Sequence, residues 1–288
     1  MNTWQAGRFN LRWSTGQPLV MGIVNVTPDS FSDGGDHAHA AQAIAHAERL
    51  LAEGADILDL GAESTRPGAE GVNAKEEWAR LQPVLQELVR WNVPLSVDTL
   101  KPAVMRLALE VGVDILNDVN GFRSPAADGA PSALDLLAAS PTVGAVVMHM
   151  QGEPRSMQNN PNYVDVCAEV LEFLQERLAV LAAAGVVAQR VLVDPGFGFG
   201  KTLAHNLSLM RDIPRQATLG AGVLVGVSRK RMIGELTGRQ NPKERLGGSV
   251  AAALYAASAG AAVVRVHDVM ATHDALTVQS ALIAGHQG

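Results

Sequence analysis

The chain has 288 residues, a formal net charge of -6 and no basic block, which argues against nucleic-acid binding through a positive surface. Its single cysteine, Cys167, has no partner for an internal disulfide and fits a reducing cytoplasm. The most apolar stretch, residues 250–264, is interrupted by Gly260 and is too short to span a membrane. Nearly half of the residues are apolar, so we expect a large buried core.

Residues 1–19 precede the first long apolar run and stand outside the pattern that follows, so we expect a short hairpin there. From residue 20 onward, short aliphatic runs alternate with helical segments. The runs cover residues 20–26, 57–60, 95–97, 115–116, 143–148, 191–193, 223–227 and 263–266. They are continuously apolar rather than alternating, as expected of parallel strands that are buried on both faces.

The segments between the runs carry the signals of helices. Helical spacing relates Leu81, Val84, Leu85 and Leu88, and likewise Leu171, Leu174, Leu178 and Leu181. Capping boxes fit Asn73 with Glu76 and Asn241 with Glu244. A glycine precedes several runs, as a left-handed helix cap requires, namely Gly54, Gly112, Gly185 and Gly260. Because strand and helix alternate eight times, we predict a single-domain (β/α)8 TIM barrel over residues 20–288, with residues 1–19 across its floor.

Polar residues follow the apolar runs. The strand ends carry Asn25, residues 59–65, Asp98, Asn117 with Asp118, His149, Asp194, residues 228–230, and Arg265 with His267. In this barrel the carboxyl ends of all strands open on one face, where enzymes of the fold carry their sites. Ordinary loop composition explains about a third of these residues. We therefore predict that the strand ends converge around one mouth.

Four of the strand ends combine hydrogen-bond acceptors and donors, namely Asp98, Asn117, Asp194 and Lys230. A carboxylate such as Asp194 can accept two N–H bonds from a flat, nitrogen-rich heterocycle, and Lys230 can donate to a ring carbonyl or nitrogen. A structural ion pair is the alternative, but buried charges are enriched in binding sites, which favours a site. Arg265 and His267 on the last strand suit phosphate groups.

Other kinds of chemistry receive less support. Residues 196–202 resemble the end of a phosphate-binding P-loop, but Pro195 stands where that motif needs glycine. The eight histidines include no zinc-type pair beside a carboxylate. No strand end offers a strong nucleophile with a matched base. A magnesium ion held jointly by an amide oxygen and a diphosphate remains open.

Eight motifs in chain order resemble one known family. They are 25–35 (NVTPDSFSDGG), 63–68 (ESTRPG), 96–99 (SVDT), 117–119 (NDV), 148–152 (MHMQG), 194–201 (DPGFGFGK), 228–230 (SRK) and 265–267 (RVH). Each motif is weak alone, but their order is specific, and together they resemble the dihydropteroate synthases over residues 18–285. That resemblance implies joining of a dihydropterin-methyl diphosphate to 4-aminobenzoate, with release of pyrophosphate.

The resemblance also implies roles for individual residues. The pterin ring is expected to contact Asp98, Asn117, Val119, Met148, Asp194, Gly226 and Lys230. The aminobenzoate side is expected to include Thr65, Arg66, Pro67, Phe199 and Ser228. The diphosphate is expected to contact Asn25, Thr65, Arg265 and His267, with Asn25 as a ligand of Mg²⁺. The residues expected to act in catalysis are Asp98, Lys230, Arg265 and His267.

The implied mechanism is dissociative: pyrophosphate leaves first, Asp98 stabilises the pterin cation, and the aminobenzoate amine then attacks. The two long loops after the first and second strands would close to exclude water. The family also implies a homodimer. Two alternatives are a methyl-folate-dependent methyltransferase barrel, which would not need the Thr65–Pro67 loop, and a non-catalytic pterin-binding relative.

Overall fold

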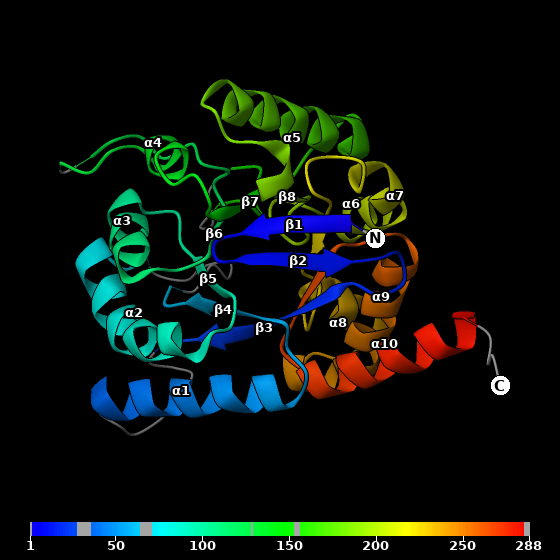
Figure 1. Ribbon diagram of the computed structural model, residues 1–288. Coiled ribbons are helices and arrows are strands. Elements are labelled where there is room, and N and C mark those ends of the chain that lie inside the picture. Colours follow the sequence, from blue (N-terminus) through cyan, green and yellow to red (C-terminus); the bar gives the residue numbers. More distant parts are fainter. Residues whose placement is uncertain (1, 28–35, 64–70, 128, 153–155, 285–288) are drawn as a thin grey trace.

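The computed structural model describes residues 2–27, 36–63, 71–127, 129–152 and 156–284. Eight parallel strands form one sheet that nearly closes into a barrel, and helices surround it (Figure 1). The strands are β3 (Leu19–Asn25), β4 (Ile57–Gly61), β5 (Leu95–Asp98), β6 (Ile115–Asp118), β7 (Gly144–Met148), β8 (Val191–Asp194), β9 (Leu224–Val225) and β10 (Val263–Val266). Their order is β8-β7-β6-β5-β4-β3-β10-β9, and a bridge between Val193 and Val223 joins the two ends. The predicted (β/α)8 barrel is confirmed.

Helices connect consecutive strands on the outside of the barrel. They are α1 (Asp36–Ala52), α2 (Ala74–Leu88), α3 (Pro102–Val111), α4 (Ala133–Ala138), α5 (Val166–Ala183), α6 (Leu203–Arg211), α7 (Ile213–Gln216), α8 (Arg231–Thr237), α9 (Leu246–Ser258) and α10 (Val269–Ala284). Short 3-10 turns are η2 (Val89–Trp91), η3 (Ala188–Arg190) and η4 (Pro242–Glu244). None of the described helices combines the length and apolar character needed to cross a lipid bilayer.

The helix-ending glycines are confirmed, because Gly54, Gly112, Gly185 and Gly260 all have φ between 87° and 101°. Two local predictions need correction. Asn241 caps only the three-residue turn η4, and α9 begins later, at Leu246, without a side-chain cap. On α5 the buried stripe runs through Val166, Val170, Leu174, Arg177 and Leu181, so Leu171 and Leu178 lie at its edge.

A hairpin made of β1 (Asn2–Ala6) and β2 (Phe9–Trp13) lies across the ring of strands (Figure 1). Its Trp4 and Trp13 belong to an apolar cluster with inward-facing residues near the strand starts, among them Met21 and Ile57. The Trp4 indole donates a hydrogen bond to the carbonyl of Arg190, at 2.9 Å. The hairpin therefore plugs the amino-terminal end of the barrel and leaves the carboxyl end as the open mouth.

The turn of this hairpin is fixed by an ion pair between the exposed Arg8 and the buried Asp114. Arg8 donates through Nε and Nη2 to the two carboxylate oxygens of Asp114, each at 2.9 Å, and Asp114 also accepts from the backbone N–H groups of Arg8 and Leu95. Two parallel bonds of this kind combine charge with a fixed geometry. The pair ties the hairpin to the start of β6.

Replacing Arg8 with methionine should lower the free energy of unfolding by about 1–3 kcal/mol, because the buried Asp114 carboxylate then keeps only backbone donors. Urea denaturation measures the change. Arg12→Met, at an exposed position of the same hairpin, is the matched control and should stay within about 0.5 kcal/mol of the parent. An equal loss in both variants would show that the ion pair has no specific role.

Candidate active site

The two-residue alternation of the strands decides which side chains enter the mouth. Met21, Ile57 and Ile115 face the barrel interior near its floor, so residues two or four positions further along the same strands face inward as well. At the carboxyl ends this register selects Asn25, Asp59, Gly61, Asp98, Asn117, Met148, Asp194, Gly226 and Arg265. Most of the residues proposed from the sequence thus face the barrel interior at its carboxyl-terminal end.

Arg265 is the centre of the first polar cluster. Its Nε lies 2.6 Å from Oδ2 of Asp59, and its Nη2 lies 2.9 Å from Oδ2 of Asp98. The Asn117 amide donates to Asp59 at 3.3 Å. The sequence places Asp59 among the polar strand ends but gives it no role, since its partner is 206 residues away and only the closed barrel brings them together.

Burial and charge together set the protonation of this cluster. Burial and, to a lesser extent, the neighbouring Asp59 carboxylate raise the pKa of Asp98 to about 7 against the opposing effect of Arg265. Burial alone would lower the pKa of Arg265, but Asp59 and Asp98 outweigh it, so the guanidinium stays charged. Asp98 therefore changes its charge near neutral pH beside a permanent cation.

Asp194 and Lys230 form the second polar cluster. The Asp194 carboxylate accepts the backbone N–H of Gly196 at 2.7 Å, and Lys230 donates to the carbonyl of Phe197 at 2.6 Å. The Lys230 ammonium lies 4.8 Å from the centre of the Phe199 ring. Burial raises the pKa of Asp194 and lowers that of Lys230 to about 8, while each group partly offsets the shift of the other.

An apolar wall lies beside these charges. Val119 and Met148 are buried together with Met150 and Met157, and Phe199 packs against them. Opposite, a Cβ built on Gly226 would lie 3.8 Å from the Cβ of Arg265, so this glycine faces the first polar cluster. The predicted residues Val119, Met148 and Phe199 therefore come together on one wall.

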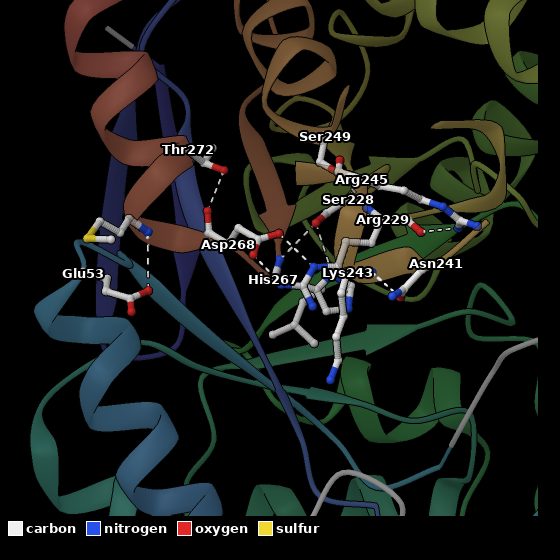
Figure 2. Close-up of polar contacts among 12 residues, drawn as sticks. Glu53, Ser228, Arg229, Asn241, Lys243, Arg245, Ser249, His267, Asp268 and Thr272 are labelled. Carbon is white, nitrogen blue, oxygen red and sulfur yellow. Dashed lines mark hydrogen bonds and ion pairs between the residues drawn. The ribbon is translucent and has the colours of Figure 1, made fainter. Parts of the chain in front are cut away.

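Polar contacts join the ends of β9 and β10, as Figure 2 shows. The Ser228 hydroxyl accepts the backbone N–H of His267 at 3.2 Å and lies 3.1 Å from its Nδ1. Arg229, in the left-handed region with φ 57°, pairs with Asp268, and its backbone N–H donates to Ser249. These ties hold Ser228 and His267 side by side at the rim.

Asp118 and His149 do not face the barrel interior, which corrects the prediction that all polar strand ends converge. Asp118 points away and accepts the backbone N–H groups of Asn120 and Phe122, each at 2.7 Å. His149 lies among side chains outside the strands, with Phe173 4.9 Å away. Both residues directly follow an inward-facing position, so the alternation turns them outward.

Asn25 and the loop after β4 also carry residues predicted from the sequence to belong to the site. Asn25 is half-buried, and its side-chain amide makes no hydrogen bond within the described residues. The described residues also contain no group of three His, Cys, Asp or Glu side chains that could hold a metal ion by themselves. An oxygen donor of this kind fits Mg²⁺ only if a ligand supplies further oxygens. Thr65, Arg66 and Pro67 lie outside the described residues.

Comparison with known proteins agrees with this geometry. The family model described as pterin binding enzyme matches residues 21–267. The dihydropteroate synthase of Neisseria meningitidis serogroup B is 54% identical over 98% of both chains. The Xanthomonas albilineans dihydropteroate synthase with 4-aminobenzoic acid has a TM-score of 0.87, 52% identity and 96% coverage of each chain. The Burkholderia cenocepacia enzyme complexed with 7,8-dihydropteroate has a TM-score of 0.87 and 48% identity, and the match covers 98% of this chain and 97% of that one.

The family match over residues 21–267 identifies this barrel as a pterin-binding enzyme. Since the similarity extends over nearly the whole chain, the chain belongs to the pterin-binding enzyme family and, within it, to the dihydropteroate synthases.

Proposed function

We propose that the protein condenses (7,8-dihydropterin-6-yl)methyl diphosphate with 4-aminobenzoate to give 7,8-dihydropteroate and diphosphate, a step of folate biosynthesis. The observation that carries the proposal is the pair of clusters in one mouth: Arg265 between Asp59 and Asp98, and Asp194 beside Lys230. One cluster suits an anionic leaving group next to a developing cation, and the other suits the polar edge of a fused heterocycle.

The pterin ring would lie between the polar and apolar walls. Asp194 would accept two N–H bonds from the amino-amide edge, and Lys230 and Asn117 would donate to ring acceptors. Val119 and Met148 would contact one face of the ring, and Gly226 would leave room for it. The heterocycle would then meet a hydrogen-bonding partner along its edge and apolar atoms on its face.

The diphosphate would lie at the rim formed by β3 and β10. A guanidinium has five N–H donors, and Arg265 uses Nε and Nη2 for the two carboxylates, so its remaining donors can reach a phosphate oxygen. His267, held by Ser228, would bind beside it. Asn25 would be the protein ligand of Mg²⁺, which when bound supplies positive charge to the leaving diphosphate.

In catalysis, the residues of the mouth would stabilise charge rather than form a covalent bond. As the C–O bond to the diphosphate breaks, the ionised Asp98 would stabilise the positive charge that spreads over the pterin. Arg265, His267 and Lys230 would stabilise the negative charge and orient the ring. The 4-aminobenzoate amine would then attack the methylene carbon, next to Phe199 and Ser228, with Thr65, Arg66 and Pro67 on the same side.

The reaction is tested by mixing the protein with the dihydropterin diphosphate, 4-aminobenzoate and magnesium, and following pyrophosphate and dihydropteroate. We expect both products in equal amounts, with no pyrophosphate when 4-aminobenzoate and magnesium are both omitted. Folded protein that binds the pterin without turnover would indicate the non-catalytic alternative. Transfer of a methyl group from methyl-tetrahydrofolate to a corrinoid would indicate the methyltransferase alternative.

We also propose that the protein is a cytoplasmic homodimer. The lone thiol of Cys167 fits a reducing compartment. An apolar groove between α6, α8 and α9 is lined by Leu207, Met210, Met232, Ile233, Leu236 and Tyr255. Leu236 and Tyr255 remain 55% and 47% exposed in the single chain. A second copy of the chain would cover this groove and the exposed residues Val278 and Leu282 of the adjoining helix α10.

Leu236→Asp combined with Tyr255→Glu should convert the dimer into a folded monomer, because two charges would then be buried at the interface. Light scattering coupled to size exclusion measures the mass, and circular dichroism checks the fold. Val187→Asp, at a 50% exposed valine before η3, is the control and should remain dimeric. A monomeric parent protein at micromolar concentration would contradict the proposal.

A further inference from the structure

Lys201 is a buried cation that the proposed reaction leaves unexplained. Its side chain is only 3% exposed. The ammonium group donates to the carbonyl of Phe199 at 3.0 Å and to that of His149 at 3.4 Å, and it lies 2.9 Å from Nδ1 of His149. Among the described residues, none of these partners is a carboxylate. Burying an ammonium without a charged partner is energetically costly, so a lysine at this buried position indicates a functional role.

The position of Lys201 is set by a loop that packs against the end of β7. Gly196 has φ 71°, and a Cβ built on it would lie 1.8 Å from the carbonyl oxygen of His149. The loop therefore contacts the neighbouring strand through backbone atoms alone. Lys201 fills the space beneath, with its Nζ 3.4 Å from the Cβ built on Gly196. This arrangement also differs from a P-loop, in which the lysine reaches the phosphates.

The same loop carries residues that the proposed function assigns to both substrates. The loop follows Asp194, whose carboxylate accepts the backbone N–H of Gly196. Phe199 lies near the end of the loop. Lys201 binds the Phe199 carbonyl directly. Burial and, to a lesser extent, the Lys201 ammonium lower the pKa of His149 to about 3, so the imidazole remains a neutral acceptor for the ammonium. The loop, the ammonium and Asp194 thus form one packed unit.

Charge connects Lys201 to Asp194 through space. Four groups favour the ionised form of Asp194, in decreasing order Lys230, the Gly196 N–H, Lys201 and Arg265. Lys201 itself faces Asp194, Lys230 and His149; burial lowers its pKa to about 7, and Asp194 opposes that change. Below pH 7 Lys201 is therefore charged and favours the ionised form of Asp194.

We propose that Lys201 is a positioning residue for pterin recognition: its buried ammonium fixes the 195–200 loop against β7 and keeps Asp194 an ionised acceptor. The inference rests on the proposed contact between Asp194 and the pterin. In this proposal Lys201 raises the affinity for the pterin without contacting the pterin. Lys230 favours the ionised form of Asp194 more strongly, but Lys230 is itself assigned to the ring.

The first test is independent of substrate. Protein labelled with ¹³C at aspartate carboxyls is titrated by NMR, and the Asp194 signal is assigned with the Asp194→Asn variant. In Lys201→Met, a chain of similar length without charge, Asp194 should titrate at a higher pH than in the parent. Lys75→Met, at an exposed lysine of α2, should leave the titration unchanged. The same Asp194 titration in parent and Lys201→Met would overturn the proposal.

The second test measures binding of the dihydropterin diphosphate by calorimetry. Lys201→Met should raise its Kd about tenfold at pH 6, where Lys201 of the parent is charged, and the difference should shrink above pH 8, where Lys201 of the parent has lost its charge. A loss of affinity that is equal at both pH values would indicate only structural disruption and overturn the proposal. A parent protein that does not bind the pterin would contradict the proposed function instead, while the NMR result would stand.

Lys201→Gln is the second variant in case Lys201→Met does not fold, because its amide can still donate to one of the two carbonyls. It should fold, as judged by circular dichroism, and should show the same upward move of the Asp194 titration. If both variants unfold, Lys201 has a purely structural role and the proposal fails.

Discussion

Asp194→Ala should raise the Kd for the dihydropterin diphosphate at least about a hundredfold and abolish measurable synthesis, while the barrel stays folded. Two charge-assisted hydrogen bonds from the pterin edge contribute about 1.5–3 kcal/mol each, and a hundredfold change in Kd corresponds to about 2.7 kcal/mol. The side chain is only 7% exposed, so water cannot replace it easily. Calorimetric titration with the pterin measures the effect.

The fold should tolerate this change because burial raises the pKa of Asp194 above its ordinary value. A carboxylate with a raised pKa opposes folding at neutral pH, where it must be ionised in a partly dry site. Asp194→Asn keeps the acceptor for the Gly196 N–H and should match the parent in thermal denaturation, or exceed it. Asp274→Asn, at an exposed position of α10, is the control for binding. Unchanged pterin affinity in Asp194→Ala would overturn its assignment to the ring.

The barrel itself could be predicted because its signals are local. Strands buried on both faces must be continuously apolar, and four of the connections from helix to strand contain a residue at positive φ, namely Gly54, Gly112, Gly185 and Gly260. One strand is shorter than its apolar run. The apolar run at residues 223–227 forms only the two-residue strand β9, because the chain bends away beyond Val225 toward Arg229 in the left-handed region.

The details of the site depend on non-local geometry. The polar character of Asp118 and His149 is as strong as that of Asn117, but whether a side chain points inward depends on its register within the strand, which one residue reverses. The partnership of Arg265 with Asp59 depends on closure of the barrel across 206 residues. Lys201 is buried only because Gly196 lets the loop approach the backbone of β7.

Asp98→Asn should lower kcat about a hundredfold and remove a rising limb from the pH profile. Removal of a single group aimed at developing charge reduces kcat by about two to three orders of magnitude. Burial raises the pKa of Asp98 to about 7, so its stabilising carboxylate forms as the pH increases through 7. In the parent, kcat/KM should therefore rise between pH 6 and 8, with a midpoint near 7.

The asparagine can still accept a hydrogen bond from Arg265, which also keeps Asp59, so the geometry of the cluster should survive. Because the amide of the variant does not ionise, kcat/KM of Asp98→Asn should stay constant between pH 6 and 8, where that of the parent rises. The KM for the pterin should change less than kcat. Ionisation of the substrates is the same for both proteins and cancels in the comparison. A limb that persists unchanged in Asp98→Asn would belong to another group, first Asp194, and Asp98 would then lose its assignment as the residue that stabilises the pterin cation.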